Sequence, residues 1–169
     1  MRRSMDFPNF RRCVAAVPLA AILATALLTP ALAAGPFAGF SGQWAGTGDI
    51  AMTDGSREKI RCKATYSVGP SGDALHIDMN CASDSYRVNI ISNVVAQGTN
   101  FSGTWKETTR QVDGSVTGRV PAPGEFQANL EGTGFGIQLS ATTNGKQQAV
   151  TIQSQGTDVQ TVNISLRKA

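Results

Sequence analysis

The segment from Ile60 to Cys81 constrains the fold of this chain most, because it is patterned as a single β-hairpin. Apolar residues occupy every second position on both sides of the turn Gly69-Pro70-Ser71-Gly72-Asp73, and a period of two is that of a half-buried strand. One register satisfies both halves and also places Cys62 directly opposite Cys81. The sequence therefore predicts an antiparallel pair whose cysteines meet at a non-hydrogen-bonded position, where side chains approach most closely.

The first 33 residues have the pattern of an export signal. Arginine pairs at 2–3 and 11–12 precede an apolar run, and Ala31-Leu32-Ala33 supplies the small residues of a cleavage site. The run is short for a membrane-spanning helix, which needs roughly 20 apolar residues. We expect residues 1–33 to be removed, a general secretory signal being favoured over a twin-arginine one. Residues 34–39 would form a flexible N-terminal segment, and residues 40–169 one domain.

Removal of the signal leaves a nearly neutral domain. Residues 1–33 hold four arginines and one aspartate, so the remaining 11 basic and 11 acidic side chains balance, although the whole chain carries +3. This balance argues against electrostatic capture of nucleic acid or of an anionic membrane. After residue 33 the sequence has no apolar run that would predict stable membrane insertion. Cys62 and Cys81 are the two cysteines that remain, and an even pair in an exported chain predicts a disulfide. We expect a bacterial protein of the periplasm or the extracellular space.

Short alternating strands continue through the rest of the chain, and no window has a helical period. A three-residue loop at Asp54-Gly55-Ser56 would place Trp44 opposite Tyr66. The Asn144-Gly145 turn would pair Leu139 with Val150. Residues 90–95 carry apolar side chains on both parities, which predicts a bulge or a strand covered on both faces.

An all-β fold follows from this pattern. A single antiparallel up-and-down meander of about 8–10 strands, each with one apolar face, must bury that face and protect its edges. Closure into a barrel does both, so we predict a barrel, with a β-sandwich as the alternative.

Catalytic patterns are missing from the sequence. His76 is the only histidine and falls on the polar face of its strand, so the sequence offers neither a histidine-based triad nor a multi-histidine metal site. No phosphate loop, nucleophile elbow or calcium loop occurs. We therefore predict that the protein is not an enzyme and has no cofactor and no metal site.

Five inward-directed residues are candidates for ligand binding. Trp44, Tyr66 and Trp105 are aromatic, and they could equally serve as packing for the core. Glu107 has the inward parity of Trp105, and an inward carboxylate needs a partner or water. It would lie either at the mouth of the barrel or in a ligand cavity as a polar anchor, with Gln148 as its companion.

Gly42-Gln43-Trp44 on the first strand, followed by a β-meander, resembles the Gly-x-Trp signature of the lipocalin-like, or calycin, barrels. Those families, which include avidin-like proteins, usually bind small hydrophobic ligands inside an eight-stranded barrel. Bacterial periplasmic inhibitors of proteases and of lysozyme also use small disulfide-bearing barrels with a Gly-x-Trp start. The resemblance thus implies two functions, and both stay open here.

The first is an exported β-barrel binding protein that holds a small apolar ligand against the inward aromatic residues. The second is an envelope protein that acts on a protein partner, such as a periplasmic protease or lysozyme inhibitor. In that case residues 34–39 would serve as an inserting arm.

Overall fold

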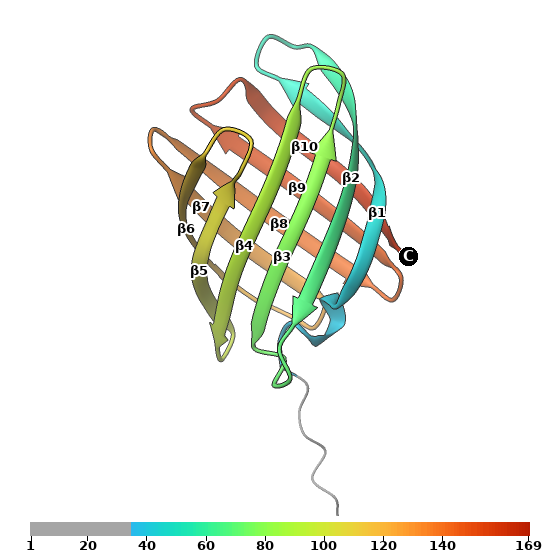
Figure 1. The fold of residues 1–169 in the computed structure, drawn as a ribbon, viewed down its shortest axis with the longest axis vertical. Helices are drawn as coiled ribbons and strands as arrows, with labels where there is room; N and C mark the ends of the chain where they lie inside the picture. The colour runs from blue at the N-terminus through green and yellow to red at the C-terminus, as the bar shows by residue number, and fades with distance from the viewer. Residues whose placement is uncertain (1–34) are drawn as a thin grey trace, which may run out of the picture. The chain divides into compact units, whose positions relative to one another are not determined.

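Ten antiparallel strands, each paired with its neighbours along the chain, close into a barrel in which β1 also pairs with β10 (Figure 1). The structure is a computed structural model and describes residues 35–169. The predicted export signal therefore lies outside the described residues. The strands are β1 (Gly42–Met52), β2 (Arg57–Val68), β3 (Ala74–Ala82), β4 (Arg87–Gln97), β5 (Asn100–Glu107), β6 (Val112–Arg119), β7 (Glu125–Gly132), β8 (Phe135–Asn144), β9 (Gln147–Gln155) and β10 (Val159–Lys168).

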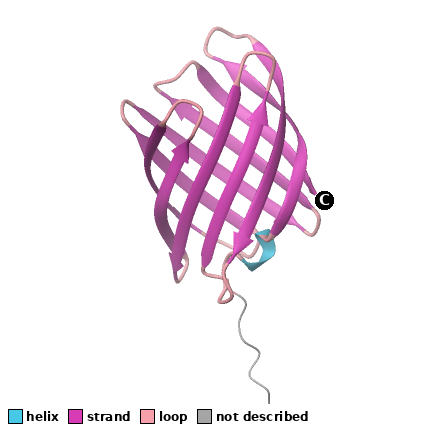
Figure 2. Ribbon diagram, in the orientation of Figure 1, coloured by secondary structure: helices cyan, strands magenta, loops and turns pink. Residues whose placement is uncertain are grey.

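The predicted meander and its closure into a barrel are confirmed, and the alternative of a β-sandwich is not adopted by the described residues. Side chains alternate as the sequence requires: on β2, Ile60, Cys62, Ala64 and Tyr66 are buried while the residues between them are exposed. Figure 2 shows strands throughout the barrel, with one short helix at its lower end. No helix in the described part of the chain is long and apolar enough to cross a membrane.

The β2–β3 hairpin has the predicted register. Cys62 lies opposite Cys81 and forms a disulfide with it, with 4.1 Å between the two Cα atoms. The Gly69 N–H donates to the Ala74 carbonyl oxygen at 2.9 Å and closes the turn. Closing a loop with a sequence separation of 19 stabilises the fold by about 3 kcal/mol in the chain-entropy description.

Two other predicted registers are wrong by two residues. Trp44 lies opposite Ala64 rather than Tyr66, because the β1–β2 turn is centred one residue earlier than predicted. The Met52 N–H donates to the Ser56 carbonyl and leaves residues 53–55, not 54–56, as the three-residue loop. Leu139 lies opposite Ile152 rather than Val150.

In the β8–β9 turn the central residues are Gly145 and Lys146, not Asn144 and Gly145. Gly145 has φ 58°, and a glycine with positive φ at the first central position is typical of a type II′ turn. A shift of two residues keeps every side chain on its own face, so the alternation could not distinguish these registers.

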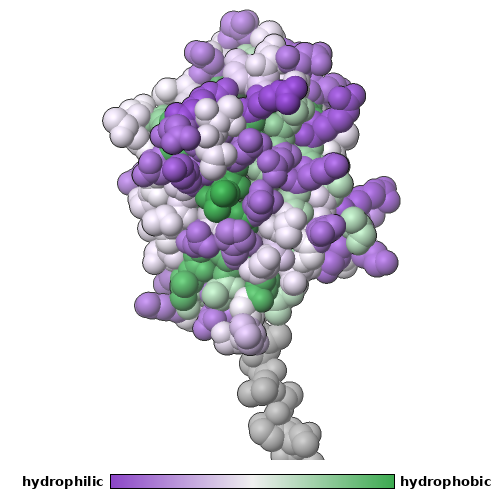
Figure 3. All heavy atoms as spheres, in the orientation of Figure 1, coloured by the Kyte–Doolittle hydropathy of each residue, from purple (hydrophilic) through white to green (hydrophobic). Residues whose placement is uncertain are grey.

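Strand β4 contains no bulge. Its pairing with both β3 and β5 is continuous, so Ile91 and Val95 point outward, where they are 38% and 54% exposed. The expectation of a bulge or of a doubly covered strand was therefore wrong. On the face formed by β3–β5 the apolar side chains occupy small separate areas between hydrophilic ones (Figure 3).

The N-terminal segment packs into one end of the barrel and is not a free arm. A short 3₁₀ helix, η1 (Ala38–Phe40), follows Phe37, and both Phe37 and Phe40 are fully buried. The Phe37 N–H donates to the Gly72 carbonyl in the β2–β3 turn at 2.9 Å. This end, which also carries the β4–β5, β6–β7 and β8–β9 turns and lies lower in Figure 1, is called the closed end.

Inward glycines allow the strands to approach closely where the barrel bends. A Cβ atom on Gly46 of β1 would lie 1.9 Å from the Ser165 carbonyl oxygen of β10. Likewise, a Cβ atom on Gly103 of β5 would lie 1.9 Å from the Asn93 carbonyl oxygen of β4. Glycine is the residue that such close backbone contacts tolerate. The two sites lie on strands almost half the barrel apart.

Candidate ligand-binding site in the barrel interior

Inward-facing apolar side chains divide into two groups along the barrel. Towards the closed end they are buried by one another. Towards the opposite end, called the open end, those of two facing walls are only half-buried although they point inward. The members of this open-end lining are Ile77 and Met79 of β3, Ile90 of β4, Leu130 of β7, Ile137 and Leu139 of β8, and Ile152 of β9. Most of these inward side chains pack against the core, and all keep part of their surface accessible, on β3–β4 and on β7–β9.

Strand β8 shows how far the partial exposure of inward side chains extends along the barrel. Phe135, Ile137 and Leu139 are all half-buried, and the next inward residue, Ala141, is buried. The four-residue rise from Phe135 to Leu139 corresponds to about 13 Å along the strand. The third wall is packed, because Ile50 of β1 and Ile164 of β10 are buried. The partly exposed inward side chains therefore form a strip along part of the interior, and this strip is called the slot.

The lining of this slot is almost wholly apolar. Buried polar side chains in the described residues are Ser92, Glu107 and Gln148, and no buried side-chain nitrogen or oxygen among them lacks a hydrogen-bond partner. Ser92 is satisfied by donating to the Thr104 carbonyl at 2.9 Å. Such a surface can bind a ligand through apolar contact but presents no unused polar anchor.

Trp44, Tyr66 and Gln148 come together at the closed end. The rings of Trp44 and Tyr66 lie 6.4 Å apart, the Trp44 Nε1–H donates to the Phe40 carbonyl at 2.9 Å, and the Tyr66 hydroxyl donates to Gln148 Oε1 at 2.9 Å. Burial raises the pKa of Tyr66 well above its ordinary value, an effect that the hydrogen bond to Gln148 partly offsets. These three residues form the floor below the slot and contact protein groups.

An aromatic cluster completes this floor. Phe40 meets Phe126 edge to face at 5.2 Å and Tyr66 at 6.4 Å, and Phe37 meets Phe101 at 5.5 Å. Edge-to-face pairs of this kind add to the free energy of burial. The closed end is therefore filled by side chains, including that of Phe37, which the sequence analysis placed in a flexible segment.

Trp105 is the predicted aromatic residue nearest to the slot. Its ring lies 5.9 Å from that of half-buried Phe135 at the open end. Its Nε1–H is shared between the carbonyl oxygens of Ser115 and Glu131, at 3.1 and 3.2 Å. These bonds fix the indole across β5–β7, so that one edge of the ring borders the interior.

Glu107 lies at the open end and organises the β5–β6 turn. Its carboxylate accepts the backbone N–H groups of Asn89, Thr109 and Arg110 at 3.0, 3.0 and 2.6 Å. Burial alone raises the pKa of Glu107, but the three donated hydrogen bonds outweigh burial and hold the pKa below its ordinary value. Glu107 and Gln148 do not lie together as predicted, since Gln148 accepts a hydrogen bond from Tyr66 at the opposite end of the barrel.

Other polar candidates lie outside the barrel. His76 is exposed on the outer wall, with its Nδ1 at 2.8 Å from the Asn93 Oδ1. Within residues 35–169 no cluster of three or more His, Cys, Asp or Glu side chains is placed to hold a metal ion. The residues that sequence reasoning missed are the open-end lining, whose inward parity was visible but whose exposure was not.

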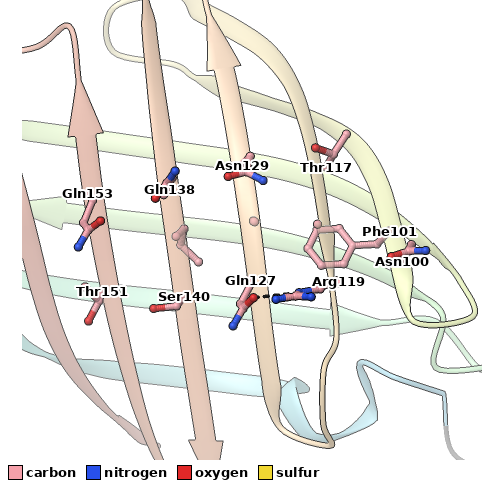
Figure 4. Close-up of a pocket in the computed structure, with 13 residues that line it drawn as sticks. Asn100, Phe101, Thr117, Arg119, Gln127, Asn129, Gln138, Ser140, Thr151 and Gln153 are labelled. Atoms are coloured by element: carbon pink, nitrogen blue, oxygen red, sulfur yellow. Dashed lines mark hydrogen bonds between the residues drawn. The ribbon is translucent and has the colours of Figure 1, made fainter.

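The outer wall carries a shallow groove of about 770 Å³ across β5–β9 (Figure 4). Its side chains are mainly uncharged amides and hydroxyls from two adjacent cross-strand rows. Arg119 is its one charged residue and donates from Nε to Gln127 Oε1 at 3.0 Å. Phe101, Ala128 and Leu139 also border the groove, so it is a mixed polar and apolar surface, more polar than the interior.

Comparisons with known proteins give similarity at the level of the fold. No family model matches the chain, and no curated protein matches it. Several solved structures are similar to this chain. Rv2717c from M. tuberculosis has a TM-score of 0.60 and 10% sequence identity, and the match covers 78% of this chain and 93% of Rv2717c. The S-type phycobiliprotein lyase CPES from Guillardia theta has a TM-score of 0.56 and 10% identity, and the match covers 78% of this chain and 89% of the lyase.

The fold is a lipocalin-like, or calycin-type, β-barrel. A third similar structure is a protein of unknown function from the DUF3598 family of Nostoc punctiforme PCC 73102, with a TM-score of 0.55 and 9% identity over 78% of this chain; the chain spans about half of its length, 48%. The resemblance expected from Gly42-Gln43-Trp44 is thus confirmed for the architecture, with ten strands here in place of eight.

Proposed function

We propose that this chain is an exported binding protein whose lipocalin-like barrel holds a small apolar ligand in the open-end slot. The observation that supports this most directly is the incomplete burial of inward residues such as Ile77 and Leu139 on facing walls. Burying exposed apolar area contributes about 25 cal/mol per Å², so a ligand seated there would gain affinity from every side chain that it covers. The similar barrel of a phycobiliprotein lyase adds support from architecture.

The ligand would be largely uncharged where it contacts the slot. Every buried polar side chain among residues 35–169 already has a hydrogen-bond partner, and Glu107, the charged one, is occupied by three backbone donors. Desolvating a second charge beside these groups without a partner is costly. Polar groups of the ligand would therefore remain at the open end, in contact with water.

Titration with the neutral apolar dye N-phenyl-naphthylamine tests this proposal. The dye fluoresces when it leaves water, and we expect saturable binding to the wild-type protein. Leu139→Trp fills the slot from β8 and should abolish the increase in fluorescence. Ser140→Trp adds the same ring at the adjacent outward position and should bind as the wild type does.

A folding control keeps this test decisive. Far-ultraviolet circular dichroism of Leu139→Trp should match the wild type, and Ile77→Phe, which narrows the slot from the facing wall, provides an independent second variant. Undiminished dye binding by both folded inward variants would contradict the proposal, as would an equal loss in Ser140→Trp.

Export forms part of the proposal. Its support is the signal pattern in residues 1–33 and the Cys62–Cys81 disulfide, a bond that persists in oxidising compartments. We also propose that the protein acts by binding and not by catalysis. The alternative, inhibition of an envelope hydrolase by an inserting arm at residues 34–39, has less support because Phe37 is buried in the barrel.

A further inference from the structure

Three basic side chains surround a second hollow, on the outer wall of the barrel. The hollow has a volume of about 510 Å³ and lies across β1–β4, with Thr109 of the β5–β6 turn at its edge. Its basic residues are Arg61, Lys63 and Arg87, and its floor includes the small side chains of Ala45 and Ala82. It is separate from the slot, because its basic side chains are exposed on the outer face of β2 and β4, whereas the slot faces inward.

Strand register explains why the cationic groups can meet. Arg61 of β2 and Arg87 of β4 both pair with Ala82 of β3, one on each side. Neighbouring strands are about 4.8 Å apart, so the two arginines stand about 10 Å apart with only a methyl group between them. Lys63 is two residues from Arg61 on the same face and pairs with Ala45. Three long cationic side chains thus border one gap floored by alanine.

Nearby carboxylates do not neutralise this group. The ion pairs among residues 35–169 are Lys59 with Asp49 and Arg110 with Glu107, and neither involves a basic residue of the hollow. The acidic residues of β2 and β3 have other partners: Asp78 accepts from Asn80 Nδ2 at 2.9 Å, and Glu58 accepts from the Ser85 N–H at 3.3 Å. No carboxylate lines the hollow.

We propose that this hollow is a binding site for a phosphate-type oxyanion, carried by a small molecule or by a lipid headgroup. Guanidinium groups bind phosphate oxygens in a bidentate manner, and Arg61 and Arg87 approach the gap from two sides. Lys63 adds a point charge, and Asn89 adds an amide at the rim. Because basic and acidic residues balance outside residues 1–33, the attraction is local to the hollow and not a property of the whole surface.

Amide chemical-shift mapping with inorganic phosphate at low ionic strength tests the site. We expect saturable shifts confined to residues around Arg61, Ala82 and Arg87, with no comparable effect of sodium chloride at matched ionic strength. Arg61→Gln/Arg87→Gln should weaken binding at least about tenfold, since each charged hydrogen bond is worth that much. Lys106→Gln/Arg119→Gln, with the same charge change at outward positions outside the hollow, should leave the affinity unchanged.

Two results would overturn the proposal: shifts distributed over all basic residues without saturation, or equal affinity in Arg61→Gln/Arg87→Gln and the wild type. Co-sedimentation with phosphatidylcholine vesicles, with and without phosphatidate, then distinguishes the two sources. Sedimentation that needs phosphatidate and the two arginines assigns the site to a headgroup. Phosphate binding without sedimentation assigns it to a soluble phosphate compound. Dye binding in the slot is unaffected in either case, so the two proposals fail independently.

Discussion

Replacing Phe40 by alanine tests whether the N-terminal segment closes the barrel. Phe40 is fully buried and makes edge-to-face contacts with Tyr66 and Phe126, and its carbonyl accepts the Trp44 indole N–H. Deleting a buried phenylalanine side chain typically costs 3–5 kcal/mol, and each aromatic pair accounts for about 0.5–1.5 kcal/mol beyond burial. We therefore expect Phe40→Ala to lower the free energy of unfolding by about 4 kcal/mol.

Equilibrium urea unfolding followed by tryptophan fluorescence measures this loss. A domain of ordinary stability has about 5–15 kcal/mol in total, so the variant would be strongly destabilised, and Phe40→Leu provides a milder change that should remain folded. Phe135→Ala is the matched control. Phe135 is half-buried at the open end, with Trp105 as its aromatic partner, and its removal should cost less than half as much.

A cost below about 1 kcal/mol for Phe40→Ala would refute this reasoning. It would mean that residues 35–40 leave the barrel in solution and that the aromatic floor is incomplete. An equal cost for Phe40→Ala and Phe135→Ala would refute the distinction between a closed and an open end.

Three further changes have defined outcomes. Glu107→Gln should lower the free energy of unfolding at neutral pH by about 1–3 kcal/mol. Because folding lowers the pKa of Glu107, the difference from wild type should shrink as the pH falls below about 4.5 through the native pKa. A pH-independent difference in urea unfolding would contradict this assignment. Cys62→Ala/Cys81→Ala should cost about 3 kcal/mol, and the intact mass of the oxidised wild-type protein without residues 1–33 should reveal no free thiol. Gly46→Ala should cost more than about 3 kcal/mol because its Cβ would collide with a carbonyl oxygen of β10, whereas Gly136→Ala, with open space around the same atom, should be close to neutral in thermal unfolding.

The barrel could be predicted from the sequence because alternation assigns each side chain to a face. The β2–β3 register was also correct, since two cysteines and a compact turn agree on it. For Trp44 and Leu139 the register depended on the assigned turns, Asp54-Gly55-Ser56 and Asn144-Gly145, and the predicted pairing was displaced by two residues. Such a shift preserves both faces, and turn geometry, which short-range patterns specify poorly, decides between the registers.

The candidate site was predictable in part. Parity correctly placed Trp44, Tyr66 and Gln148 inside the barrel, but it could not show which end is filled. That depends on Phe37, which lies before the first alternating segment and packs against Phe101 far along the chain, and on Phe40, which packs against Phe126. The hollow beside Arg61 and Arg87 was missed for a similar reason, because cross-strand neighbours become visible only once the register is known.

Intermolecular nuclear Overhauser effects from bound N-phenyl-naphthylamine to methyl-labelled protein test the central claim most directly. A ligand in the open-end slot should give contacts to the methyl groups of Ile77 and Leu139 on facing walls. Contacts confined to Ile91 and Val95, the exposed apolar residues of the outer wall, would contradict the account, as would saturable binding without contacts to any inward methyl group.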